Sequence, residues 1–135
     1  MIDVGTEGAS VDRTIILGGA RTPFGRLGGS LATKSAMELG GIAISCAVER
    51  SGVEPADVQH VVMGQVLQGG CGQIPARQAA FLAGLDKTVT AETINRVCGS
   101  GMRAVELADI EIRVGLHDVI VAGGMESMSP ATMTS

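Results

Sequence analysis

Two kinds of segment follow one another along the chain when its residues are sorted into apolar and polar positions. Short runs of β-branched and other apolar residues predict buried strands, at 13–17, 58–63, 88–97 and 118–122. Longer stretches with apolar residues three and four apart predict helices, at 35–52, 75–84 and 99–114. Because strands and helices alternate, we expect an α/β fold, with a mostly parallel sheet and helices on its faces.

The helix expected between Ser35 and Gly52 carries the clearest local signals. Ser35, followed by Glu38 three residues later, is a capping box that satisfies backbone N–H groups at the start of a helix. Gly52 marks its end. The apolar positions at helical spacing predict a stripe that faces the core, made of Leu39, Ile42, Ala43, Cys46 and Ala47.

Length and composition limit the classes of protein that fit. With 135 residues, 45% of them hydrophobic and 18% charged, the chain makes one globular domain or a piece of one. We interpret 1–12 as a flexible N-terminal tail and 13–135 as the domain. A net charge of −4 and two aromatic residues, both Phe, argue against nucleic-acid binding. There is no apolar run of roughly 18 residues and no signal peptide, so we expect a cytoplasmic protein that binds no membrane.

Three cysteines and two histidines, widely spaced, indicate neither a disulfide framework nor a zinc site, so we expect reduced thiols and no metal. Cys46 lies on the apolar stripe and is interpreted as core, whereas Cys71 lies in a glycine-rich loop and is expected to be exposed. His60 and His117 each lie at the start of an expected strand and are interpreted as solvated residues.

Residues 95–102, NRVCGSGM, are the strongest candidate for chemistry. They place Cys98 where an expected strand passes into an expected helix. Unpaired backbone N–H groups and the positive end of a helix dipole at such a junction stabilise a thiolate over a thiol. The glycines that follow Cys98 leave room for a bulky thioester and its developing oxyanion. From spacing alone, a nucleophilic cysteine and a buried cysteine that packs as a small hydrophobe both fit.

The same residues also allow a dinucleotide-binding βαβ interpretation. Residues 99–104 (GSGMRA) match G-x-G-x-x-A between a strand and a helix, a pattern that binds pyrophosphate. The acid that binds the ribose should close the next strand, but Gly123 and Gly124 occupy that place, between Asp118 and Glu126. The acidic partner of this fingerprint is therefore missing from its expected position.

Five blocks of sequence, taken in order, closely resemble the N-terminal part of the thiolase family, and within it the acetyl-CoA acetyltransferase group. They are RTPFG at 21–25, GQVLQ at 64–68, GQIPARQA at 72–79, NRVCGSG at 95–101 and AGGMESMS at 122–129. Five ordered blocks are far more specific than any one motif. The resemblance implies that the chain is the truncated N-terminal half of a thiolase-like fold, roughly the first third of a thiolase, without the C-terminal domain.

The resemblance implies a thiolase-type acyltransferase. In that family the cysteine that matches Cys98 takes the acyl group from an acyl-CoA, and an acetyl-CoA carbanion then attacks the acyl-cysteine in a Claisen condensation, or the reverse occurs in thiolysis. The family also needs a histidine and a second cysteine from C-terminal motifs that this sequence lacks, and neither His60 nor His117 matches them. We therefore expect the chain alone to be inactive in condensation. The alternative to an enzyme is a truncated structural fragment, which folds only by assembling with itself or with a separate C-terminal chain.

Partners and ligands also follow from the resemblance. The implied substrates are acyl-CoA and acetyl-CoA, with no covalently bound cofactor. Relatives pair their third strand across a dimer interface, so we expect a homodimer or homotetramer that uses the strand edge near 88–94. Cofactor-binding residues stay unassigned, because Arg21 and Arg77 are interpreted as residues that fix loops. Asp109 and Arg113 are expected to form an ion pair. The sequence fixes neither the acyl-chain length nor the direction of the reaction.

Overall fold

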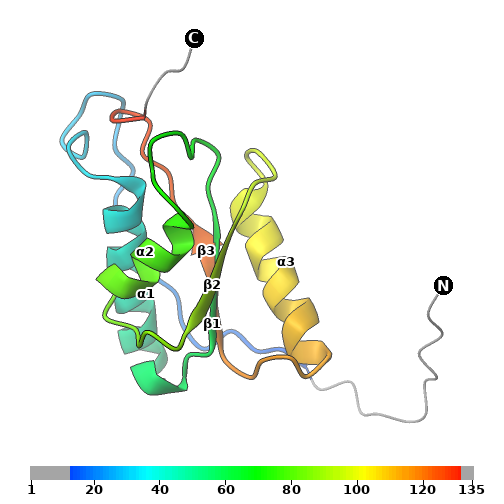
Figure 1. Ribbon diagram of the computed structural model, residues 1–135. Helices are drawn as coiled ribbons and strands as arrows, with labels where there is room; N and C mark the ends of the chain where they lie inside the picture. Colours follow the sequence, from blue (N-terminus) through cyan, green and yellow to red (C-terminus); the bar gives the residue numbers. More distant parts are fainter. Residues whose placement is uncertain (1–12, 132–135) are drawn as a thin grey trace, which may run out of the picture.

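The computed structural model describes residues 13–131 (Figure 1). In chain order its elements are helix α1 (Ala36–Ser51), the short 3-10 helix η1 (Pro55–Asp57), strand β1 (His60–Gly64), helix α2 (Pro75–Leu82), strand β2 (Thr90–Ile94), helix α3 (Ser100–Arg113) and strand β3 (Ile120–Gly124). The interpretation of 1–12 as a tail concerns residues outside this described part. Within 13–131, no helix combines the length and apolar character that a membrane crossing requires.

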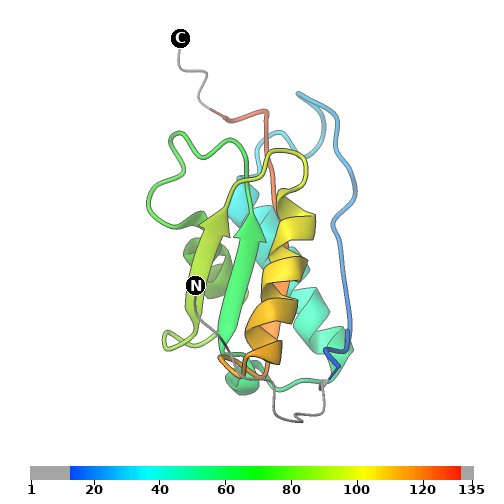
Figure 2. The ribbon, with the colours of Figure 1, turned by 90° about the vertical axis from the view of Figure 1, so that its right-hand side faces the viewer.

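A parallel sheet forms the centre of the fold. Its strands lie in the order β2-β1-β3, and both outer strands pair with β1 in parallel. The register starts the strands level with one another, at His60, Thr90 and Ile120. Helix α3 covers one face of the sheet, and α1 and α2 cover the other (Figures 1 and 2). The predicted α/β fold with helices on both faces of a parallel sheet is confirmed.

The hydrophobic core lies between the sheet and the pair α1 and α2. Val61 and Met63 of β1 belong to it, together with buried residues of both helices such as Ile44 and Ala79. Successive strand residues point to opposite faces, so Val62, which is also fully buried, faces α3. Full burial of such side chains stabilises the fold by about 1.5–3 kcal/mol each. The central strand is therefore covered on both sides.

Helix α1 begins and ends where its sequence predicts. The Ser35 hydroxyl accepts a hydrogen bond from the Glu38 N–H at 3.1 Å, and the Glu38 carboxylate accepts one from the Ser35 N–H at 2.8 Å. Gly52, with φ of +72°, provides the left-handed C-cap. Both halves of the capping box are present, which confirms the predicted start of the helix.

The predicted core-facing stripe of α1 is wrong. Ile42 is 50% exposed, and the buried residues of the helix are Ala36, Gly40, Gly41, Ile44 and Val48. The reason is the close packing of α1 on its neighbours: a β-carbon on Gly41 would lie 2.9 Å from the β-carbon of Leu82 in α2. Because a glycine adds nothing to an apolar pattern, the periodicity of larger residues selects the wrong face.

The strand predicted at 13–17 is also wrong. These residues have no regular secondary structure and lie outside the sheet, and Ile15 and Ile16 are 71% and 85% exposed. The chain then passes the C-terminal end of α1, where a β-carbon on Gly18 would lie 2.9 Å from the backbone of Ser51. A strand needs a neighbour for its N–H and C=O groups, and within the described residues no strand pairs with this segment.

The other predicted elements are confirmed with shifted ends. Helices α2 and α3 end within two residues of the predicted positions, and α2 opens with Pro75 in its first turn, as expected. Each strand starts two residues later than its apolar run predicts. An apolar run indicates which residues are buried. The strand itself begins only where its residues pair with a neighbouring strand.

Candidate active site

Cys98 lies at the carboxyl end of the sheet. β2 ends at Ile94 and α3 begins at Ser100, so Cys98 falls in the short connection between them, as the sequence predicts. The residue is exposed to solvent, which excludes the interpretation of Cys98 as a buried packing residue. In open α/β sheets, ligands bind just beyond the carboxyl ends of the strands. Cys98 is therefore accessible at the end of the sheet where this kind of fold binds its ligands.

The first turn of α3 keeps free hydrogen-bond donors close to Cys98. The N-cap residue is Gly99, and no side chain caps the helix. Within the described residues, the N–H groups of Gly101 and Met102 have no hydrogen-bond partner. Free N–H groups at the positive end of a helix dipole favour negative charge. A negatively charged atom of a ligand bound beside Cys98 is therefore stabilised there.

Two polar side chains hold the connection in a strained turn. Val97 has φ of +51°, a region that β-branched residues rarely adopt and that costs about 1–3 kcal/mol. The Asn95 Oδ1 accepts from the Val97 N–H at 2.9 Å. The buried Ser100 hydroxyl accepts from the Arg96 N–H at 2.7 Å and donates to the Val97 carbonyl at 2.6 Å. These bonds fix the backbone immediately before Cys98.

Glycines allow the start of α3 to approach the ends of the strands. A β-carbon on Gly101 would lie 3.6 Å from the nitrogen of Gly124, and one on Gly124 would lie 3.4 Å from the α-carbon of Gly101. A β-carbon on Gly64, at the end of β1, would lie only 2.5 Å from the β-carbon of Ser100. The lack of side chains at these positions lets helix and sheet backbones touch, which sets the position of Cys98 relative to the sheet.

The carboxylate of Glu126 fastens the loop that follows β1. It accepts from the Val66 N–H at 2.8 Å and from the Leu67 N–H at 3.2 Å. Each oxygen of Glu126 accepts a hydrogen bond from a backbone N–H, so Glu126 is not free to bind a ribose. This argues against the dinucleotide-binding interpretation. Nothing in the sequence pairs an acid after β3 with backbone amides after β1, so this clamp is visible only in the structure.

Cys71 belongs to the same loop and is held within it. The Gln65 Nε2 donates to the Cys71 sulfur at 3.3 Å and to the Leu67 carbonyl at 3.0 Å. The Gln78 Nε2 donates to the Cys71 carbonyl at 2.7 Å. Cys71 is half-buried, so the expectation that it is exposed is wrong, because the loop folds back over Gln65.

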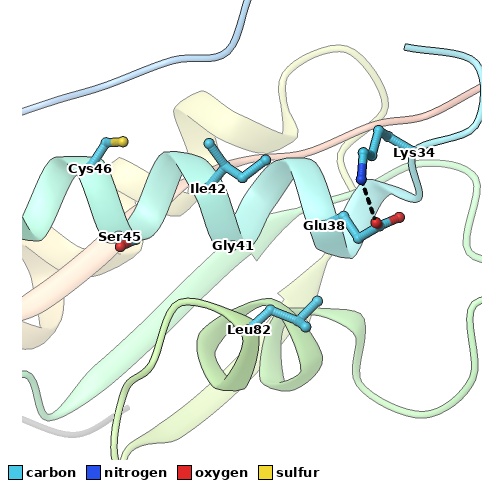
Figure 3. Close-up of a pocket in the computed structure, with 7 residues that line it drawn as sticks. All are labelled: Lys34, Glu38, Gly41, Ile42, Ser45, Cys46 and Leu82. Atoms are coloured by element: carbon cyan, nitrogen blue, oxygen red, sulfur yellow. Dashed lines mark hydrogen bonds and ion pairs between the residues drawn. The ribbon is translucent and has the colours of Figure 1, made fainter.

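An open groove of about 370 Å³ lies between α1 and α2 (Figure 3). Lys34 and Glu38 form an ion pair of 3.0 Å at one end, and Leu82 of α2 points toward the groove. Cys46 lines it and is half-buried, whereas the sequence places it in the core. No lining residue belongs to the connections at the carboxyl end of the sheet. Cys98, at the junction of β2 and α3, therefore remains the candidate site.

His60 and His117 lie at the opposite end of the sheet from Cys98, where the strands begin. Their rings are stacked, with centroids 4.8 Å apart and planes within 2° of parallel. His60 is only 8% exposed, and the His117 Nδ1 lies 2.9 Å from the Glu111 carboxylate. The interpretation of two solvated histidines is therefore wrong, because the register of the strands and the last turns of α3 bring them together.

The predicted structural roles of charged residues hold. Arg77 donates to two carbonyls of the 87–89 turn, at 2.6 and 2.7 Å, and Arg21 donates to the carbonyl of the next residue at 3.1 Å. Arg113 and Asp109 form the expected ion pair at 2.9 Å. The Arg113 guanidinium lowers the pKa of the Asp109 carboxyl. The Arg77 contacts fix a loop, and the Asp109–Arg113 pair lies in the last turns of α3.

Comparison with known proteins gives a family match over most of the chain. The family model described as "Thiolase, N-terminal domain" matches residues 14–135. This range contains every element of the sheet and all three cysteines.

Relatives with established names are close in sequence over the same region. An acetyl-CoA acetyltransferase of Cupriavidus necator is 55% identical over 117 residues, which cover 87% of this chain and 30% of that protein. A mitochondrial acetyl-CoA acetyltransferase of Aspergillus fumigatus is 51% identical, covering 88% of this chain and 28% of that protein. A cytosolic acetyl-CoA acetyltransferase of Gibberella zeae is 49% identical, and the match covers 90% of this chain and 31% of that protein. The chain thus spans about 30% of the length of these relatives.

Proposed function

Because the chain belongs to the thiolase family, we propose that it carries the nucleophile of a thiolase-type acyl-CoA acyltransferase, with Cys98 as the residue that accepts the acyl group. The observation that carries the proposal is the position of Cys98, exposed beside the uncapped first turn of α3. A sulfur nucleophile suits acyl transfer because it attacks a thioester well and also leaves well.

In the proposed step the Cys98 thiolate attacks the carbonyl carbon of an acyl-CoA. A bond forms between the Cys98 sulfur and that carbon, and the carbonyl oxygen takes up the negative charge. When the carbonyl forms again, the bond to the sulfur of coenzyme A breaks and coenzyme A leaves as a thiolate. The free N–H groups and the dipole of α3 favour both the attacking thiolate and the developing oxyanion.

We limit the proposal for this chain to that acylation step. Condensation also needs a base that removes a proton from the methyl group of acetyl-CoA. The two histidines lie at the other end of the sheet, and Cys71 is engaged by Gln65. We therefore propose neither the histidines nor Cys71 as this base.

The acyl donor that we propose is acetyl-CoA, since the relatives are named acetyl-CoA acetyltransferases. Coenzyme A then takes part as substrate, and no covalently bound cofactor is needed for the acylation step. The names of the relatives include a mitochondrial and a cytosolic form. The cytosolic relative supports the cytoplasmic location that we propose for this chain.

We also propose that the chain forms a homodimer or a higher oligomer through β2. This strand lies at one edge of the sheet, and within the described residues its outer side has no neighbouring strand. An open edge of a sheet pairs readily with the same strand of a second copy.

Alkylation by iodoacetamide at neutral pH tests the proposed role of Cys98. Trypsin cuts after Lys and Arg and so places the three cysteines on separate peptides, 35–50, 51–77 and 97–103. We expect the peptide with Cys98 to be alkylated first and acetyl-CoA to slow only that reaction. Cys46 and Cys71 serve as internal controls. Equal and slow alkylation of all three peptides, or no protection by acetyl-CoA, would overturn the proposal.

A further inference from the structure

A cluster of histidine and glutamate side chains lies between the sheet and α3, near the start of the strands. His60 of β1, Glu92 of β2 and Glu111 of α3 each direct a ligand atom into it, and these atoms all lie within 4.8 Å of one another. His60 is buried and the two glutamates are partly buried. Three elements that are distant in sequence therefore bring a nitrogen and two carboxylates together, at the other end of the sheet from Cys98.

The Thr90 hydroxyl lies between the His60 ring and the Gln59 carbonyl. The Thr90 hydroxyl donates its single proton to the Gln59 carbonyl at 3.2 Å, and its oxygen lies 2.6 Å from the His60 Nδ1. With its proton engaged in this way, the hydroxyl oxygen can accept a hydrogen bond from a protonated Nδ1 of His60. In the neutral ring the Nε2 atom then carries a lone pair, and it faces the Glu111 carboxylate at 4.0 Å. A ligating imidazole is commonly oriented by such a hydrogen bond from its other nitrogen.

His117 orients Glu111 in a similar way. Its Nδ1 donates to the Glu111 Oε2 at 2.9 Å, and its ring stacks on the ring of His60. The Glu111 side chain is 16% exposed, so this contact holds the carboxylate within the cluster. The carboxylate has a second oxygen and further lone pairs for another partner. His60 and Glu111 are thus both held by neighbouring side chains while each keeps an acceptor atom directed into the cluster.

We propose that His60, Glu92 and Glu111 bind a divalent metal ion of the zinc class. Imidazole nitrogen with carboxylate oxygen is a donor set that suits Zn²⁺. Zinc holds such ligands at about 2.0–2.2 Å, which places them roughly 3.3 Å apart in a tetrahedron. The separations of up to 4.8 Å are wider, so the proposal requires the ligand side chains to move closer together around the ion. Water completes the coordination.

The competing account is a metal-free ion pair, in which protonated His60 is attracted to the Glu111 carboxylate. The two accounts differ in the charge of His60, which is neutral as a metal ligand, and in the role of Glu92. The ion pair needs only His60 and Glu111, which lie 4.0 Å apart. The metal site needs the Glu92 carboxylate as well, and Glu92 comes from the edge strand. Substitution of Glu92 therefore separates the two accounts.

Titration of the full chain with Zn²⁺, followed by NMR of the imidazole rings, tests the site. The sequence has two histidines, so the ring signals are few and assignable. The thiols are first alkylated with iodoacetamide, because free cysteines also bind zinc. We expect the His60 signals to shift saturably with one equivalent of zinc. Signals that stay unchanged, or binding that requires the free thiols, would overturn the proposal.

Variants give the second arm of the test. Glu92→Gln and Glu111→Gln should each weaken zinc binding by at least about ten-fold. Glu106→Gln is the matched control, because Glu106 is a glutamate of the same helix that pairs with Arg96 and Arg103 outside the cluster. If Glu111→Gln does not fold, Glu92→Gln alone decides. Unchanged affinity in Glu92→Gln supports the ion-pair account and overturns the metal site.

Discussion

Gly64, the last residue of β1, lies directly against Ser100, the first residue of α3. A β-carbon on Gly64 would stand 2.5 Å from the β-carbon of Ser100 and 2.7 Å from the nitrogen of Gly101. Real β-carbons do not approach other atoms so closely, so the start of α3 can take its place only because Gly64 has no side chain. The position of Cys98 thus depends on a residue more than thirty positions earlier in the chain.

Gly64→Ala should displace the first turn of α3. The added methyl group meets backbone atoms, which cannot rotate away, so we expect a loss of roughly 1–3 kcal/mol in the free energy of unfolding. Gly69→Ala is the control, because the space beside Gly69 is open. Denaturant unfolding measures both variants, and equal stability of the two would contradict the close packing.

Ser100→Ala should loosen the turn that carries Cys98. The substitution removes the bonds to the Arg96 N–H and the Val97 carbonyl, and it leaves a donor without its partner at a cost of about 1–3 kcal/mol. We also expect Cys98 to lose its advantage over Cys46 in the rate of alkylation. Ser45→Ala, at an exposed position of α1, should change neither quantity. A Ser100→Ala protein with unchanged stability and alkylation would show that these bonds do not hold the turn.

The capping box of α1 predicts a dependence of stability on pH. The Ser35 N–H and the Lys34 ammonium lower the pKa of Glu38 from 4.5 to about 2. Since the folded state holds the charged form, Glu38 stabilises the fold above about pH 4.5, and this contribution is lost as the pH falls toward 2. The difference in unfolding free energy between the wild type and Glu38→Gln should therefore be largest at neutral pH and vanish below pH 2.

Glu49→Gln, an exposed substitution in the same helix, is the control for this pH series. The difference in unfolding free energy between Glu49→Gln and the wild type should not show the pH dependence expected for Glu38→Gln. Should the Glu38→Gln difference stay constant from pH 7 to pH 2, the charge of Glu38 would have no part in capping the helix.

Ala91→Pro should prevent pairing at the free edge of β2. The Thr90 N–H donates to the Gln59 carbonyl and the Ile94 carbonyl accepts from the Gln65 N–H, so these residues face β1. Strand residues alternate, and the N–H of Ala91 therefore points outward. Proline removes this donor and is tolerated at an edge. Sedimentation should show a dimer for the wild type and for Ala91→Val, but a folded monomer for Ala91→Pro. A wild-type monomer, or a dimer of Ala91→Pro, would contradict the edge interface.

The sequence correctly predicts those features of the structure that depend on residues close together along the chain. Ser35, Glu38 and Gly52 predict the limits of α1, because each acts on backbone groups within a few residues. The junction that carries Cys98 is predicted in the same way, from a β-branched run followed by glycines and an apolar helical pattern.

Tertiary contacts account for what the sequence did not predict. The apolar run at 13–17 indicates burial but not the strand that would cover it. Gly41 packs closely against Leu82, and an absent side chain leaves no mark in a hydrophobic pattern. His60 and Glu111 meet only because β1 and α3 lie against each other, and nothing at their own positions indicates it.

Direct detection of an acyl-enzyme tests the central claim, that Cys98 accepts an acyl group. The full chain is incubated with acetyl-CoA, digested with trypsin, and examined by mass spectrometry for a thioester on each of the three cysteine peptides. The account predicts one acetyl group on peptide 97–103, none on 35–50 or 51–77, and none at all in Cys98→Ser. An unmodified peptide 97–103, or equal acetylation of all three peptides, would contradict it.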